Sequence, residues 1–335
     1  MRKVINPTNK ALLKTLGEEF IAPLLEVLAH ARTQGCRVQT PQALKVVSAT
    51  RQKVLVAAFA ISLGKSNRKT FGARCNAAIK AADIADLAKL SGEYAAQVAD
   101  LRAGRNPQVT VVVPKSIVAL CKDIIYGKLF DHKDIWTALG LPPLTRTQFH
   151  ENFRQDNGYP STCPYCDLDT MNSEGSSVVE HLFPKSKFPL LSVDGYNLFS
   201  SCWACNGPAG KGNHTVAQLA SPYDHEVGML VDFKHDAAQM KLEIVAQSGR
   251  PDVDGYLQLL QLQIRYARPG VWNQFNSRRE AIVESLQQRK FASLNELDAY
   301  VVKQQKGAVL TYAVAHWARA ALRPAHVKRP RKGKP

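Results

Sequence analysis

Two pairs of cysteines, each with two residues between its members, constrain this chain more than any other feature. The first pair is Cys163 and Cys166, and the second is Cys202 and Cys205. Together they supply four thiolates, which suits tetrahedral Zn²⁺ with bonds of about 2.3 Å. A closed shell of four sulfurs leaves no position for water, so we expect a structural zinc site. Four unrelated cysteines, or iron in place of zinc, are the alternatives.

The other three cysteines, Cys36, Cys75 and Cys121, lie in segments with helical periodicity and are expected to be buried thiols. An odd total with paired spacing favours metal binding in a reducing compartment over a disulfide framework. The longest apolar run, 54–63, is about half of the roughly 20 residues that a membrane span needs. A signal peptide requires an apolar stretch after its basic residues, and none follows the basic residues at the start of this sequence. We therefore expect a cytoplasmic protein without a membrane partner.

Positive charge is unevenly distributed along the chain. The net charge of +16 divides into +11 for residues 1–160, −2 for 161–318 and +7 for 319–335. A polyanion is the natural partner of such basic flanks, because each neutralised phosphate releases condensed counterions. A basic composition is also common in proteins that bind no nucleic acid. One basic cluster also has two interpretations, a DNA-contacting patch or a solubilising surface. Its members are Lys65, Arg68, Lys69, Arg74 and Lys80.

The pattern of apolar residues predicts a predominantly helical α+β protein. Helices are predicted over 12–28, 42–63, 73–101, from 114 onward, and over 149–156, 256–266, 271–290 and 295–321. A short strand is predicted at 110–113, and alternation at 229–233 and 241–245 predicts a hairpin or two strands.

Composition predicts four regions. A helical N-terminal domain of unknown role covers 1–143, because Gly140-Leu-Pro-Pro143 interrupts the helical pattern. A zinc-containing domain covers 144–250, and helices at 251–322 are expected to pack on it. The segment 323–335 is rich in Pro, Lys and Arg and is predicted to be a disordered basic tail.

A possible hydrolytic site lies between and just after the cysteine pairs. His181 directly follows Glu180, Asn197 comes sixteen residues later, and Asn206 directly follows Cys205. Hydrolysis of a phosphodiester needs a base for water and a cation for the leaving oxygen. His181 is the candidate base. Glu180 and Asn206 offer oxygen ligands for a divalent ion, and Asn197 is expected to hold the loop of His181 by hydrogen bonds to the backbone.

The string EHLFPKSKFP, followed by YNL and CWACN, resembles the HNH endonucleases, in particular a bacterial branch with Glu-His in place of Asp-His and flanking CxxC pairs. The resemblance covers about residues 150–235. It implies a ββα-metal core, in which a hairpin carries His181 as general base and a helix carries Asn206. It also implies that Glu180 and Asn206 bind Mg²⁺ or Mn²⁺, that Asn197 orients the base, and that the four cysteines hold structural zinc.

One position departs from the family pattern. A Lys usually follows the last Asn by three residues, whereas Lys211 follows Asn206 by five, and His214 is a second candidate for the last metal ligand. Lys185 and Lys187 beside the site, together with Lys211, are expected to contact phosphates. The resemblance implies double-stranded DNA as substrate, although the residues do not separate DNA from RNA.

The same resemblance implies an ATPase or other regulatory subunit as a partner, in a bacterial antiviral defence role. The alternative function is a non-catalytic zinc-ribbon protein that binds DNA, which would need the cysteines but neither His181 nor Asn206.

Overall fold

The protein is described from a computed structural model, which places residues 1–64, 70–171, 177–207, 210–286 and 308–321, with 291, 293, 296, 299 and 300. The chain forms two compact units. Unit 1 comprises Met1–Val4, Pro160–Val178 and Ser201–Pro335, and unit 2 comprises Ile5–Tyr159 and Val179–Ser200. The predicted tail and the cluster residues Lys65, Arg68 and Lys69 lie outside the described residues.

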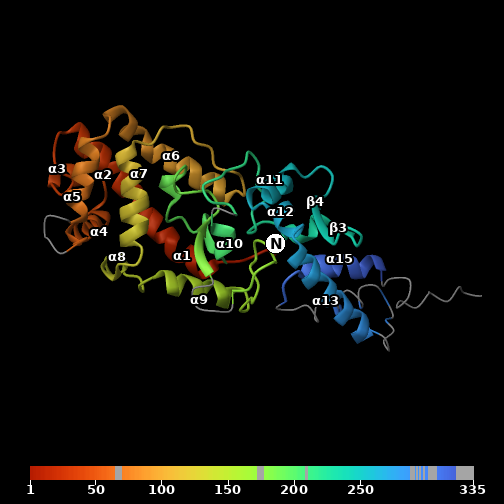
Figure 1. Ribbon diagram of the computed structural model, residues 1–335. Helices are drawn as coiled ribbons and strands as arrows, with labels where there is room; N and C mark the ends of the chain where they lie inside the picture. The colour runs from red at the N-terminus through yellow and green to blue at the C-terminus, as the bar shows by residue number, and fades with distance from the viewer. Residues whose placement is uncertain are drawn as a thin grey trace, which may run out of the picture. The chain divides into compact units, whose positions relative to one another are not determined.

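Unit 2 is built mainly from helices, drawn from red to yellow-green in Figure 1. In chain order they are α1 (Pro7–Leu16), the π-helix η1 (Gly17–Ile21), α2 (Ala22–Thr33), α3 (Pro41–Leu44), α4 (Ala49–Ala60), α5 (Phe71–Lys80), α6 (Ile84–Arg102), α7 (Lys115–Ala119), the π-helix η3 (Leu120–Leu129), α8 (Lys133–Ala138) and α9 (Arg146–Asp156). The predicted helical N-terminal half is therefore confirmed. Large aromatic side chains fill its core: Phe20, Phe71, Phe130, Trp136, Phe149 and Phe153.

Polar caps interrupt two of the predicted helices. The helix predicted at 42–63 is two helices, because the Ser48 hydroxyl accepts a hydrogen bond from the Arg51 N–H at the start of α4. The helix predicted at 73–101 is also two. There the Asp83 carboxylate accepts from the Ala85 N–H and begins α6.

The strand predicted at 110–113 is wrong. The backbone N–H and hydroxyl of Thr110 both donate to the carboxylate of Glu93 on α6, and the Gln97 side chain on the same helix donates to the Gln108 carbonyl. These bonds to helix side chains satisfy the polar groups that a strand would have paired with a neighbouring strand.

Two short strands, β1 and β2, precede and follow residues 182–197 in the chain. β1 (Ser177–His181) pairs with β2 (Leu198–Cys202), and the 3-10 helix η4 (Pro189–Leu191) lies in the connection between them. Residues 179–181 and 198–200 belong to unit 2, and the outer ends of both strands belong to unit 1. β2 runs directly into the single turn α10 (Trp203–Asn206), so the element order is strand, strand, helix.

Unit 1 contains the predicted hairpin and the C-terminal helices. Its elements after α10 are the 3-10 helix η5 (Val227–Met229), β3 (Val231–Asp236), β4 (Lys241–Ala246), α11 (Pro251–Leu259), α12 (Leu262–Tyr266), α13 (Pro269–Leu286) and α15 (Thr311–Ala321). β3 and β4 are antiparallel, with Phe233 opposite Ile244, which confirms the prediction. Both strands turn apolar residues inward at alternate positions. The expected α+β, mainly helical fold class is therefore confirmed.

Among the described residues, no helix combines the length and the apolar character that crossing a bilayer would require.

Candidate active site and metal centre

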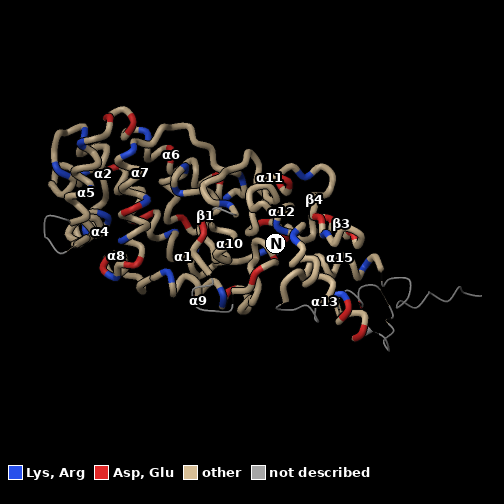
Figure 2. Tube along the Cα trace, in the orientation of Figure 1, with Lys and Arg blue, Asp and Glu red and all other residues tan. Residues whose placement is uncertain are grey.

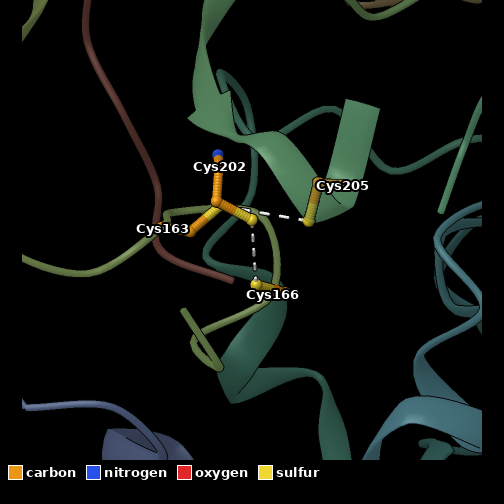
Figure 3. A group of neighbouring side chains, drawn as sticks. All are labelled: Cys163, Cys166, Cys202 and Cys205. Carbon is orange, nitrogen blue, oxygen red and sulfur yellow. Dashed lines mark hydrogen bonds between the residues drawn. The ribbon is translucent and has the colours of Figure 1, made fainter. Parts of the chain in front are cut away.

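The four predicted zinc ligands form one buried group in unit 1. Cys163 and Cys166 come from a tight turn, Cys202 ends β2 and Cys205 lies in α10. The sulfurs all lie within 4.8 Å of one another (Figure 3), with 4.0 Å between Cys163 and Cys205 and 3.8 Å between Cys166 and Cys202. Tetrahedral Zn²⁺ with bonds of about 2.3 Å places its sulfurs about 3.8 Å apart. The group can therefore hold a metal ion such as zinc.

The electrostatics of the thiols also favour a bound cation. Burial raises the pKa of Cys163, but hydrogen bonds from its neighbours outweigh burial and lower that pKa well below the usual value. Burial and the surrounding sulfurs raise the pKa of Cys205 well above it. Four buried sulfurs cannot all ionise at neutral pH without a compensating positive charge. A metal ion supplies that charge and displaces the thiol protons.

A charged pair that the sequence did not indicate lies against the sulfurs. The guanidinium of Arg265 on α12 donates from one nitrogen to Cys205 Sγ (3.2 Å) and from another to the Asp169 carboxylate (2.9 Å). Only 5% of Arg265 is exposed, so its charge acts in a medium of low dielectric constant. Four thiolates around Zn²⁺ would carry a net charge of −2, and this guanidinium places a positive charge against one of the sulfurs. No local motif marks Arg265, which lies 60 residues after Cys205.

Two tyrosines join the C-terminal helices to the first cysteine turn. The Tyr256 hydroxyl on α11 donates to the Tyr165 carbonyl (2.6 Å), and the Tyr266 hydroxyl on α12 donates to the Cys166 carbonyl (2.8 Å). Helices α11 and α12 thus contact the first cysteine turn within unit 1.

Glu180 and His181 end β1 in unit 2, and both are buried, with 1% and 6% of each residue exposed. His181 Nε2 lies 3.0 Å from the Ser192 carbonyl oxygen. A carbonyl only accepts hydrogen bonds, so Nε2 carries the proton and Nδ1 carries the lone pair of the neutral ring. The ring packs against Tyr126 in an edge-to-face arrangement, with 4.5 Å between ring centroids. His181 is therefore held in one tautomer and one orientation.

Asn197 makes the backbone hydrogen bonds that the sequence predicted. Its Oδ1 accepts from the Phe183 N–H (2.7 Å), and its Nδ2 donates to the carbonyls of Phe183 and Leu191 (3.0 Å each). Its own carbonyl accepts from the Leu182 N–H. One fully buried side chain thus fixes both ends of the loop that follows His181.

A basic and aromatic cluster borders His181 in unit 2. The ammonium of Lys185 lies 4.1 Å from the centre of the Tyr126 ring, and the guanidinium of Arg146 lies 4.6 Å from it. Arg146 is fixed by an ion pair with Asp131. Burial, together with Arg146 and Lys122, lowers the pKa of Lys185 below its usual value. The motif itself contains Lys185, so that residue was predicted. Tyr126 and Arg146 were not predicted, because both precede the motif by more than thirty residues.

The predicted site residues are divided between the units. Those in unit 2 are Glu180, His181, Lys185, Lys187 and Asn197. Those in unit 1, besides the four cysteines, are Asn206, Lys211 and His214. Asn206 ends the single-turn α10, and His214 is exposed in the following loop. Lys187 is exposed, as a phosphate contact requires. Lys211 is only 1% exposed, so its placement gives the predicted phosphate contact no support.

Comparison with known proteins gives no family for this chain. No protein-family model, no curated protein and no solved structure matches it. The resemblance to HNH endonucleases therefore depends on the sequence motif.

Proposed function

We propose that this chain is a metal-dependent endonuclease of the HNH type that hydrolyses DNA, with His181 as general base. The observation that carries the proposal is the fixed imidazole. Ser192 sets its tautomer, Tyr126 its orientation, and Asn197 the loop behind it. Geometry of this kind is expected where a ring nitrogen must take a proton from water in one direction. The order β1, β2, α10 also agrees with the core that the resemblance implies.

In the proposed reaction, His181 Nδ1 removes a proton from water, and the oxygen of that water attacks the phosphorus. The bond to the leaving oxygen then breaks. A Mg²⁺ or Mn²⁺ ion, with Glu180 as one ligand, would stabilise the charge on that oxygen. Lys185 and Lys187 would hold the phosphate backbone. The cysteine centre would take no part in the chemistry, because four sulfurs complete its coordination shell.

The decisive experiment compares His181→Ala with the parent protein in cleavage of plasmid DNA, single-stranded DNA and RNA, with Mg²⁺ and with Mn²⁺. We expect the substitution to slow cleavage by about 10²–10⁴-fold, the usual contribution of a positioned base. His132→Ala is the matched control, since His132 caps α8 at the surface, and it should cut at the parent rate. Equal rates for the parent and His181→Ala would refute the assigned role.

A non-catalytic zinc protein that binds DNA is the second candidate, and the buried four-cysteine group favours it equally. It predicts salt-sensitive DNA binding with no cleavage under any divalent ion. It also predicts that His181→Ala binds DNA like the parent. An antiviral role with an ATPase partner is an extension by analogy. Co-purification with the product of a neighbouring gene, and a change in cleavage on adding that product, would test it.

A further inference from the structure

A basic pocket in unit 1 is lined by none of the residues used in the proposed hydrolysis. It has a volume of about 280 Å³. Three cations line it, Arg2, Lys3 and Arg319, and the other lining residues are Glu226, Met229, Thr311, Tyr312 and Ala315. The start of the chain therefore lies beside α15, as Figure 1 also shows.

Backbone hydrogen bonds hold the first residues in this position. The Arg2 N–H donates to the Pro164 carbonyl and the Val4 N–H to the Pro222 carbonyl, both at 2.9 Å. The Gly228 N–H donates to the Met1 carbonyl at 2.8 Å. These bonds fix the backbone on either side of the Arg2 and Lys3 side chains, so two of the three cations need little ordering to meet a ligand.

The wall of the pocket that is formed by the start of α15 is hydrogen-bonded to the turn of the first cysteine pair. Asp167, next to Cys166, accepts from the Tyr312 N–H with its carboxylate (3.0 Å) and from the Leu310 N–H with its carbonyl (2.6 Å). On α15 the Thr311 hydroxyl accepts from the Arg2 guanidinium (3.4 Å), which links the two walls. Both walls of the pocket are thus hydrogen-bonded to other parts of unit 1 as well as to each other.

The lining of this pocket carries a net positive charge, whereas residues 161–318 as a whole do not. Glu226, whose carboxylate accepts from the Tyr312 hydroxyl (2.6 Å), leaves the lining a net charge of +2. Residues 161–318 together carry −2, and α13 shows both Lys/Arg and Asp/Glu in Figure 2.

We propose that this pocket binds neighbouring backbone phosphates of DNA, none of them the phosphate of the bond that is cut. An arginine fork and an ammonium are the groups that recognise phosphate oxygens. The volume exceeds what a single phosphate group needs, and Met229 and Tyr312 give the adjoining sugar an apolar wall. The inference shares its nucleic-acid ligand with the proposed function but needs no catalytic residue.

The test measures binding of a fluorescent DNA duplex of about 20 base pairs in EDTA, over a range of salt concentrations. The double variant Arg2→Gln/Arg319→Gln removes two pocket charges. Lys234→Gln/Arg268→Gln removes two charges from exposed residues of unit 1 outside the pocket and is the matched control. Two lost phosphate contacts should lower the slope of log affinity against log salt by about 1.8. Affinity near physiological salt should fall by roughly tenfold or more, and the control should keep the parent slope.

An unchanged salt slope in the pocket variant, or an equal change in the control, would overturn the proposal. The variant Lys3→Gln guards against misfolding, because its exposed side chain can be neutralised without touching the Arg2–Thr311 bond. It should lower the slope by about 0.9. Plasmid cleavage by the parent protein separates the two hypotheses. Cleavage with an unaltered slope refutes the pocket alone, and pocket-dependent binding without any cleavage refutes the nuclease alone.

Discussion

At the scale of single residues, Asn197 gives the sharpest prediction. Asn197→Ala leaves the Phe183 N–H and the carbonyls of Phe183 and Leu191 without their partner in a buried loop. Each such group costs about 1–3 kcal/mol, so we expect stability to fall by at least about 3 kcal/mol. We also expect cleavage to fall by more than the folded fraction accounts for, because the loop that orients His181 is released. Urea unfolding and cleavage assays at a temperature where the variant is folded measure both effects.

Asn157 offers a matched control in the same unit. Its side chain also makes three hydrogen bonds to the backbone, with the Ile5 N–H, the Ile5 carbonyl and the Phe153 carbonyl, but at the end of α9. Asn157→Ala should lower stability without a separate loss of cleavage. If both variants lose activity only in proportion to their stability, Asn197 has a purely structural role.

The residues that the sequence could identify are those whose meaning depends on close neighbours. The spacing of Cys163, Cys166, Cys202 and Cys205 was enough to predict their convergence. The hydrogen bonds of Asn197 were likewise predicted from the motif. Arg265 could not be found in this way, because its role beside Cys205 depends on how α12 packs. Tyr126 is hidden for the same reason, since it meets His181 only through tertiary packing.

At the scale of elements, the contact of α1 with the loop before Asn197 can be tested through Gly195. A Cβ at this position would lie 2.9 Å from the Lys10 Cα and 3.3 Å from the Leu13 Cβ of α1. Backbone atoms cannot move aside cheaply, so Gly195→Ala should lower the free energy of unfolding by about 1–3 kcal/mol. Gly92→Ala is the control: Gly92 lies within α6 with no atom near the added methyl group, and it should gain about 1 kcal/mol. A neutral Gly195→Ala would contradict the close contact.

The contact of α9 with β2 predicts a dependence of stability on pH. His150 Nδ1 on α9 lies 2.8 Å from Ser200 Oγ on β2. Burial, helped by Arg154, lowers the pKa of His150 from 6.5 to about 4. The unfolded chain therefore binds a proton below pH 6.5 that the folded chain binds only near pH 4. Stability present above pH 6.5 should be lost as pH falls towards 4, by about 3 kcal/mol at most.

Urea unfolding of the parent and His150→Gln at pH 7.5 and pH 5 measures this contribution. The parent should lose more stability than the variant over that interval. If both lose the same amount, other groups control the acid sensitivity of the protein.

The sequence predicted the type of most elements, helix or strand, better than the residues at which each element begins and ends. Periodicity gave the helices and the β3–β4 hairpin, because burial of one face sets the spacing of apolar residues. It did not show that Ser48 and Asp83 divide two helices, although both are residue types that favour helix starts. The π-helices η1 and η3 leave no trace in the apolar pattern. The apolar run at 110–113 suggested a strand because the pattern does not include the competing bonds to Glu93.

At the scale of the whole molecule, the boundary between the two units differs from the boundary that the composition predicted. Gly140–Pro143 is not a boundary in the structure, since residues 5–159 all belong to unit 2. The reason is a set of buried asparagines. Asn9 on α1 donates to the Phe149 carbonyl and accepts from Asn152, both at 2.9 Å, which joins α9 to the first helix. Pairings across about 140 residues leave no signal in local composition.

The last prediction concerns the four-cysteine group, because its members come from segments of unit 1 that are separated in the chain. Cys163 and Cys166 precede residues 179–200 of unit 2, and Cys202 and Cys205 follow them. Elemental analysis should find about one zinc per chain. Chelation, or Cys202→Ser, should expose unit 1 to proteolysis, because the binding energy of a structural zinc site is folding energy. Cys121→Ala is the control, since burial raises the pKa of that thiol to about 12 and keeps it protonated. It should retain the metal. A chain that contains no metal and still resists proteolysis in unit 1 would show that packing around Arg265, Tyr256 and Tyr266 suffices to hold the turn of the first cysteine pair.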